Sequence, residues 1–214
     1  MSSPAFRRVL DHVGAAVVGG DLPAGARTSV EALVEETLAS RSIVREATRV
    51  LVALGLLTAG PRVGLVVQPA GNWNLLDPHV VRWRLAGPDR EAQLGELREL
   101  REALEPAAAQ AAARRADAAT RDRLRELAVA FDRRPGEFAR LDAELHDTLS
   151  RACGNPMVVA LGAVVALAVH DRAGVPARTH DVRLHADLAR AVADGDAATA
   201  GELVREIVTR TSRE

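Results

Sequence analysis

The sequence contains no lysine or tyrosine and one cysteine, and aromatic residues make up only 2% of its 214 residues. The single Cys153 excludes a disulfide framework and a cysteine-rich zinc finger, and it fits a reducing compartment. With so few aromatic rings, the core must be built from alanine, leucine and valine, a composition that favours packed helices. With 48% hydrophobic residues, the chain can bury the core of one large or two small domains.

Long apolar runs and a surplus of either charge are also missing. No stretch reaches the roughly 18 to 20 apolar residues that cross a bilayer, and the start lacks a charged segment followed by an apolar one. We therefore expect a cytoplasmic protein with no membrane partner. The 28 basic residues, all arginine, are balanced by 29 acidic ones, so the formal net charge is -1. This balance excludes a protein whose whole surface is basic. Any binding of nucleic acid therefore has to use a local basic surface.

A break in the hydrophobic periodicity over residues 68–79 divides the chain. We predict a first domain over residues 1–70, a linker over 71–79 and a second domain over 80–214. Beyond the break the pattern is helical, without alternating strands, and it predicts an all-α bundle. The predicted helices cover about 77–86, 91–115, 120–131, 135–152, 156–172, 180–193 and 197–212.

The first domain is predicted to consist of three helices followed by a hairpin. Apolar residues at spacings of three and four predict a helix over about 4–18, and Ser29 and Ser40 can cap two more. Gly55 ends the third helix. Short β-prone runs within residues 56–67 then surround a glycine-rich turn, which predicts a hairpin. The fold class is therefore mostly α, with an N-terminal winged helix-turn-helix and a helical second domain.

The third predicted helix carries arginines opposite its apolar stripe, at Arg41, Arg45 and Arg49, with Ser40 and Ser42 at its start. Guanidinium groups bind guanine edges or phosphates, and hydroxyls at a helix start reach phosphate oxygens. Charged outward faces are ordinary on solvated helices. Here, however, another helix precedes this one at helix-turn-helix spacing and a hairpin follows it, which favours binding to double-stranded DNA.

The segment from Ser40 to Ala47 resembles the recognition helix of GntR-type regulators, and Leu54-Gly55-Leu56-Leu57 resembles the exit from that helix. The resemblance continues through the wing as Pro61-Arg62-Val63-Gly64. It implies that Arg62 lies at the wing tip and that Gly64 allows a close approach. The outward helix face, the hairpin tip and the resemblance together predict contacts to operator DNA from Ser40, Arg41, Ser42, Arg45, Arg49, Arg62 and Gly64.

Two positions depart from that family's pattern. Glu31 stands where an arginine is common early in the second helix, and Leu38 stands where the turn usually has a glycine. We therefore expect an operator that differs from the commonest one. The turn also has to form without the conformational freedom of glycine.

Asp142 and His146 lie four residues apart on a predicted helix, so their side chains share one face. Such a pair can hold two corners of a transition-metal site, or it can be a simple hydrogen-bonded couple. His185 lies on another predicted helix among apolar residues, as a satisfied core histidine would. Residue spacing alone leaves these alternatives open.

These residues, with Arg101, Glu105 and the segment at Gly154 and Asn155, resemble the FCD-type effector domain of the FadR subfamily. There an aspartate and three histidines commonly hold a metal such as zinc, against which a small carboxylate binds. By this resemblance Asp142, His146 and His185 are metal ligands. The residues expected to bind the effector are Arg101, Asp142, His146, Asn155 and His185, together with His170, which lies late in an apolar predicted helix.

One metal ligand of that pattern is missing, because the third histidine would fall at Ile207. Either the metal is lost, or it is held more weakly with waters, or another residue such as His170 supplies a nitrogen. Arg101 is also ambiguous, because it can bind an effector carboxylate or simply pair with Glu102 or Glu105.

The linker and the residues after it, from Asn72 through Trp83, resemble those of FadR-type regulators that respond to sugar acids such as galactonate. The resemblance implies an aldonate as the effector. Trp73 and Trp83 offer large apolar bodies with one hydrogen-bond donor each. We expect them to dock the DNA-reading domain on the bundle.

The leading hypothesis is therefore a homodimeric transcriptional repressor of a sugar-acid or related carboxylate operon, controlled by a small organic acid. Two DNA-reading domains are expected because one helix reads too little sequence. The alternatives are a small metal-dependent hydrolase using Asp142, His146 and His185, and an interaction module without an effector. We expect no enzyme, because the sequence shows no evident general base, oxyanion-hole motif or nucleophile elbow.

Overall fold

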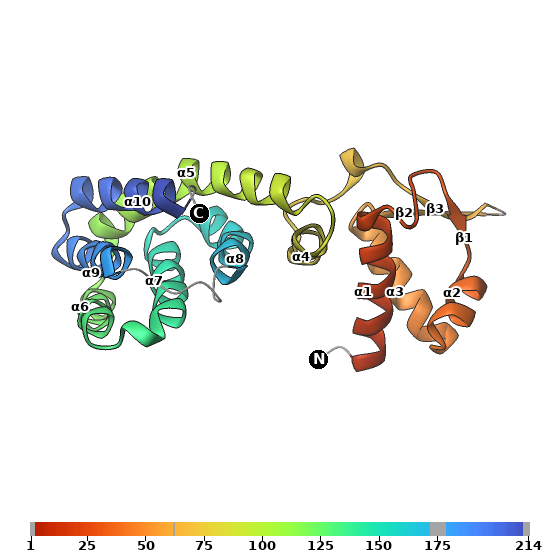
Figure 1. The fold of residues 1–214 in the computed structure, drawn as a ribbon, viewed down its shortest axis with the longest axis horizontal. Helices are drawn as coiled ribbons and strands as arrows, with labels where there is room; N and C mark the ends of the chain where they lie inside the picture. The colour runs from red at the N-terminus through yellow and green to blue at the C-terminus, as the bar shows by residue number, and fades with distance from the viewer. Residues whose placement is uncertain (1–2, 62, 172–178, 212–214) are drawn as a thin grey trace. The chain divides into compact units, whose positions relative to one another are not determined.

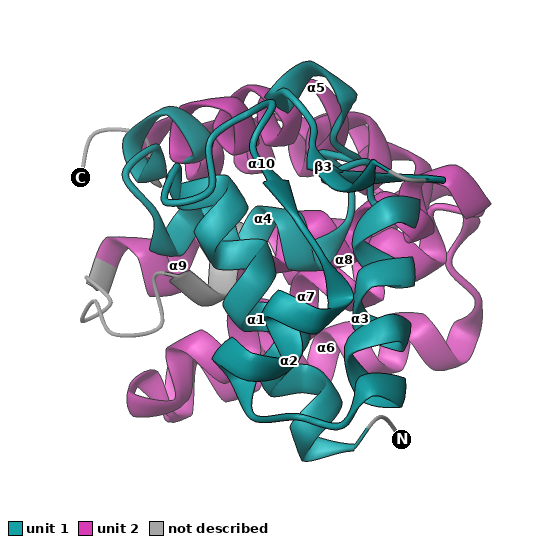
Figure 2. Cartoon of the chain, turned by 90° about the vertical axis from the view of Figure 1, so that its right-hand side faces the viewer, with its two compact units in different colours: residues 1–93 teal, residues 94–214 magenta. Residues whose placement is uncertain are grey.

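The computed structural model describes residues 3–61, 63–171 and 179–211, which contain ten α-helices and a three-stranded sheet (Figure 1). The chain forms two compact units, residues 1–93 and 94–214 (Figure 2). The first holds a winged helix-turn-helix and the second is helical, so the predicted fold class is confirmed. The division lies further along the chain than the break in the sequence pattern.

Serine caps start the helices of the first unit. The hydroxyl of Ser29 accepts a hydrogen bond from the backbone N–H of Ala32, and that of Ser40 accepts one from Ile43, as the sequence predicts. The first helix packs against the third, and their apolar faces share one core. The elements of this unit are α1 (Pro4–Gly19), β1 (Arg27–Thr28), α2 (Val30–Thr37), α3 (Arg41–Ala53), β2 (Leu57–Gly60), β3 (Gly64–Val67), the 3-10 turn η1 (Ala70–Asn72) and α4 (Pro78–Ala86).

The wing is a three-stranded antiparallel sheet with β3 in the middle. The predicted hairpin is present, with Thr58 opposite Val66. The sequence did not reveal β1, which pairs Arg27 with Val66 and Thr28 with Leu65. A strand of two residues is too short to show alternation, and only its pairing with β3 defines it.

Leu38 makes the turn between α2 and α3 in a left-handed conformation, with φ of 53°. Its backbone N–H donates to the carbonyl of Val34 at 3.0 Å, which ends α2. The side chain is 88% exposed, so no burial offsets the strain, which costs roughly 1–2 kcal/mol for a non-glycine residue. The turn therefore forms without glycine, as expected.

The segment before α4 and α4 itself belong to the first unit and pack on its core. Trp73 donates its indole N–H to the carbonyl of Gln68 at 3.0 Å, and Trp83 donates to Asp11 of α1, also at 3.0 Å. Both rings pack on the core of the first unit. A Cβ at Gly55 would lie 2.0 Å from the carbonyl oxygen of Asn72, so only glycine allows this close approach.

The second unit consists of helices whose order follows the sequence prediction. Gly195, with φ of 83°, ends one helix, and Asp196 caps the next by accepting from the N–H of Thr199 at 3.0 Å. In the bundle α6 packs on α9, α9 on α10 and α7 on α8. These elements are α5 (Arg90–Arg115), α6 (Ala118–Arg133), the 3-10 turn η2 (Pro135–Glu137), α7 (Phe138–Ala152), α8 (Pro156–Asp171), α9 (Thr179–Asp194) and α10 (Ala197–Thr211).

The described residues form helices of up to 26 residues. Among them, none combines enough length with enough apolar character to cross a membrane.

Candidate functional site

Helix α3 presents its arginines to solvent. Arg41, Arg45 and Arg49 are all exposed, and the opposite face of the helix is buried. The hydroxyls of Ser40 and Ser42 lie 3.1 Å apart at the helix start. Exposed cations, hydroxyls and backbone N–H groups at a helix N-terminus are the groups that bind phosphates and base edges.

Glu31 lies beside this surface. Its carboxylate forms an ion pair with the guanidinium of Arg41 at 3.0 Å, and both side chains are more than half exposed. The departure from the family pattern that the sequence shows at Glu31 therefore changes the charge next to the first arginine of α3. Sequence spacing alone does not show this contact.

Gly64 begins β3, directly after the turn that follows β2. Gly64 has φ of 77°, and a Cβ there would lie 2.8 Å from the carbonyl oxygen of Thr28. Glycine is therefore required for the pairing of β3 with β1 as well. Arg62 lies outside the described residues.

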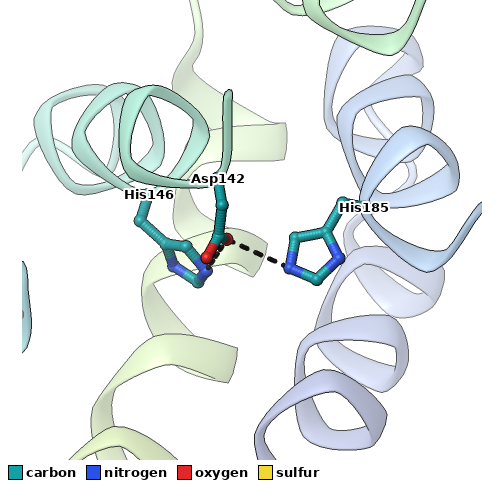
Figure 3. Close-up of side chains that lie close together, drawn as sticks. All are labelled: Asp142, His146 and His185. Carbon is teal, nitrogen blue, oxygen red and sulfur yellow. Dashed lines mark ion pairs between the residues drawn. The ribbon is translucent and has the colours of Figure 1, made fainter. Parts of the chain in front are cut away.

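Three buried side chains in the second unit converge, although they come from two helices (Figure 3). Asp142 and His146 project from α7, and His185 projects from α9. The Oδ1 atom of Asp142 lies 3.2 Å from Nε2 of His146 and 3.1 Å from Nε2 of His185. The structure thus brings together the three residues that the resemblance selects.

Neighbouring groups orient both imidazoles. Nδ1 of His185 lies 2.6 Å from the carbonyl oxygen of Asp181, and a carbonyl only accepts, so the proton is on Nδ1 and Nε2 faces Asp142. The Oε2 atom of Glu105 lies 3.6 Å from Nδ1 of His146, on the side away from Asp142. Such outer partners set which nitrogen is available to a metal.

Two phenylalanines form an apolar wall on His185. The ring centroids of Phe131 and Phe138 lie 5.6 and 4.9 Å from that of the imidazole. The sequence has three phenylalanines, and two of them meet here. Both rings cover this side of the cluster, and no motif in the sequence indicates this contact.

The cluster has perturbed protonation equilibria. Burial by itself would raise the pKa of Asp142, but the imidazoles of His185 and His146 outweigh burial and hold that pKa well below its usual range. Burial would likewise lower the pKa of His146, but Glu105 and Asp142 outweigh it and raise that pKa. Perturbed groups of this kind are enriched at functional sites.

The unsatisfied atoms of the cluster fit a metal ion. Although Asp142 Oδ1 and His146 Nε2 are buried and close together, neither forms a hydrogen bond with any described group. A carboxylate oxygen and two imidazole nitrogens are a donor set that zinc and related divalent metals accept. Ile207 is buried in the core and has no donor atom, and among the described side chains no fourth ligand joins the group. His170 lies in α8, but its side chain is outside those described.

Arg101 is buried near the cluster and is bound by Glu105. Its Nε donates to Oε1 of Glu105 at 2.7 Å, and Nη2 lies 3.3 Å from Oε2. Burial would lower the pKa of Arg101, but this carboxylate outweighs burial and raises it. The guanidinium is therefore engaged by a carboxylate of its own helix. Asn155 is exposed, and its Oδ1 accepts from the N–H of Met157 at 3.0 Å, which caps α8.

A cavity of about 180 Å³ lies between α7 and α8 and reaches His146. The sequence pattern does not reveal this cavity, because its walls come from two helices whose packing only the fold defines. On α7 it is lined by Ala143, His146, Asp147, Ser150 and Arg151, and on α8 by Val159, Gly162, Ala163, Val165 and Ala166.

Comparison with known proteins agrees with both units. The model of the family described as "Bacterial regulatory proteins, gntR family" matches residues 6–67, and that of the FCD domain matches residues 96–210. The galactonate operon transcriptional repressor of Escherichia coli K12 is 30% identical over 163 residues, which cover 74% of this chain and 71% of the repressor.

Solved structures show the same fold. A GntR protein of Streptococcus agalactiae has a TM-score of 0.54 at 20% identity, covering 98% of this chain and 100% of that chain. Lar, described as controlling expression of the agr system of Listeria monocytogenes, has a TM-score of 0.63 at 16% identity, covering 100% of this chain and 96% of that chain.

Proposed function

Because the chain belongs to the GntR family of bacterial regulatory proteins and carries an FCD domain, we propose that its DNA affinity is set by a small organic acid bound at Asp142, His146 and His185. It is a DNA-binding transcriptional regulator by family. The observation that carries the effector proposal is the buried cluster of one carboxylate and two oriented imidazoles with unsatisfied atoms.

We propose that the cluster holds a divalent transition metal such as zinc. When bound, the metal supplies a positive charge and an open coordination position for a carboxylate oxygen. The chain's residues do the rest: Asp181 and Glu105 orient the imidazoles, and the phenylalanines exclude water. Arg101 and His170 are proposed further contacts to the acid, and so is Asn155 if it leaves its capping bond.

The proposed DNA surface comprises the start and outer face of α3 together with the wing. Two copies of the chain would present two such surfaces to a palindromic operator. The proposed location of the protein is the cytoplasm, where bacterial DNA lies. The effector changes operator affinity only if it binds one arrangement of the DNA-reading units better than another. The residues proposed to contact DNA are Ser40, Arg41, Ser42, Arg45, Arg49, Arg62 and Gly64.

The kinship with a galactonate operon repressor supports repression of a carbohydrate-acid or related carboxylate operon. An aldonate is accordingly one candidate effector. We propose no catalytic role, because the family consists of transcription regulators. The competing hydrolase proposal predicts that a bound acid ester is turned over, whereas a regulator binds its effector unchanged.

The test uses a labelled DNA fragment from the region upstream of the protein's own gene, with a scrambled fragment for comparison. Fluorescence anisotropy would be measured with and without zinc and a panel of carboxylates. Arg45→Ala should weaken binding to the fragment at least tenfold and leave zinc binding unchanged. Arg205→Ala, which removes the same charge from an exposed position on α10, should have little effect.

The effector part has its own variant. Asp142→Asn should abolish the response to zinc and carboxylate while leaving binding to the fragment intact, because Asp142 lies outside the DNA-binding unit. Unchanged DNA affinity in Arg45→Ala, or an unchanged carboxylate response in Asp142→Asn, would refute the corresponding part of the proposal.

A further inference from the structure

The wall that α8 contributes to the cavity has no polar side chain. From Pro156 to Val169 the helix contains only apolar residues. A helix that is apolar on every face normally lies in a core. Here α8 packs on α7, and Val159 and Ala163, which line the cavity, remain exposed. The helix therefore presents an apolar surface on which no side chain can bond a hydroxyl group.

Polar groups of the cavity lie on the α7 side. His146 reaches it from the cluster, and Ser150 adds one hydroxyl. Asp147 and Arg151 are bonded to each other, with Arg151 Nε donating to Asp147 Oδ2 at 2.8 Å, and both are mostly exposed. A molecule in the cavity thus meets polar partners along one edge and hydrocarbon along the other.

This asymmetry disfavours a polyhydroxylated acid. An aldonate has a hydroxyl on every carbon after the carboxylate, and these hydroxyls point to both sides of an extended chain. Those that face α8 would lose water without gaining a partner. Each such group lowers affinity by about tenfold.

The volume limits the size of the occupant. About 180 Å³ is less than the roughly 300–1,000 Å³ of typical ligand pockets. This space suits an acid of four or five carbon atoms better than a six-carbon sugar acid.

We infer that the cavity binds a short aliphatic carboxylate, hydroxylated at C2 at most, with its carboxylate toward His146 and its alkyl tail along α8. The inference rests on the proposed effector function and specifies its ligand class. A C2 hydroxyl is tolerated because it lies next to the carboxylate, at the polar edge. Hydroxyls further along the chain meet Val159, Ala163 and Ala166.

The test compares acids of equal carbon number by isothermal titration calorimetry on the full chain loaded with zinc. The acids are butyrate, 2-hydroxybutyrate and 2,3,4-trihydroxybutyrate, with galactonate as a longer aldonate. We expect butyrate and 2-hydroxybutyrate to bind at least tenfold more tightly than the trihydroxy acid, and galactonate to bind most weakly.

Matched variants locate the site. Ala163→Leu should fill the cavity and weaken butyrate binding at least tenfold while zinc content and melting temperature are kept. Ala160→Leu makes the same change at an exposed α8 position that does not line the cavity and should leave binding unchanged. Ala163→Ser places a hydroxyl on the apolar wall. It should reduce the difference in binding affinity between butyrate and the trihydroxy acid.

Three results would overturn the inference. Tighter binding of the trihydroxy acid or galactonate refutes the ligand class but leaves an acid-responsive regulator in place. Equal butyrate binding in Ala163→Leu and the unaltered chain refutes the location. If no acid binds the zinc-loaded protein although it binds its upstream DNA, the proposed effector function fails and the ligand class fails with it.

Discussion

The indole N–H of Trp83 in α4 donates to the carboxylate of Asp11 in α1 at 3.0 Å, and the indole ring lies directly over Gly14. A helix that follows the winged-helix elements is thereby locked onto the first helix of the chain. The ring is accommodated because α1 has no side chain at this position. Trp83 therefore makes α4 a part of the DNA-binding unit.

The first prediction concerns this contact. In Gly14→Ala the new Cβ would lie 2.4 Å from the ring, so the ring or the helix has to shift. We expect the free energy of unfolding to fall by about 1–3 kcal/mol, as overpacking in a core does. Gly19→Ala is the control, because nothing lies within 4 Å of its Cβ. Urea denaturation measures both, and equal stability of the two variants would contradict the packing argument.

The second prediction concerns the ion pair of Glu31 with Arg41. Glu31→Gln removes a negative charge beside the proposed DNA surface and releases Arg41 for phosphate contact. We expect several-fold tighter binding to all DNA sequences and a salt-dependence slope steeper by about one. Asp21→Asn removes the same charge from the loop after α1 and should change little. DNA titrations at several salt concentrations measure both the affinity and the slope. An unchanged DNA affinity in Glu31→Gln would show that the carboxylate does not restrain Arg41.

The third prediction concerns the buried pair of Arg101 and Glu105. Glu105→Met leaves the guanidinium buried without its carboxylate, and we expect a loss of about 3–5 kcal/mol in unfolding free energy. The double variant Arg101→Met, Glu105→Met should recover most of that loss, because no unpaired guanidinium remains buried at position 101. Glu102→Met, at an exposed neighbouring position, is the control. A double variant no more stable than Glu105→Met would contradict this account.

The fourth prediction links pH, metal and stability. The raised pKa of His146 means that its protonated form stabilises the metal-free fold below about pH 6.5, and that this contribution is lost as pH rises through the raised value. The lowered pKa of Asp142 means that its ionised carboxylate stabilises the fold above about pH 4. This contribution is lost as the pH falls and the carboxylate takes up a proton. The metal-free protein should therefore melt at lower temperature in mildly alkaline than in mildly acidic buffer.

Added zinc should reverse this pH dependence of the melting temperature. The metal requires neutral imidazoles, so it binds more tightly as the histidines lose their protons. The increase in melting temperature on adding zinc should grow between about pH 5.5 and 8. His146→Gln should lose both effects, whereas His12→Gln, at an exposed histidine of α1, should keep them. A zinc effect that does not vary with pH would argue against His146 as a ligand.

Local signals in the sequence were sufficient for the helices, their caps and the relation of Asp142 to His146. Ser29, Ser40 and the pair Gly195-Asp196 mark helix ends because capping involves neighbouring residues only. The spacing of four residues places Asp142 and His146 on one face in any helix. The mostly α class and the winged helix followed for the same reason.

Only the tertiary structure decided which distant residues meet. His185 comes to Asp142 because α9 packs beside α6 and α7, and Phe131 and Phe138 reach it by the same packing. Trp83 joins α1 through the space above Gly14, and the cavity at His146 exists because α8 crosses α7. Each of these depends on contacts between segments far apart in the chain, which hydrophobic periodicity along one segment does not encode.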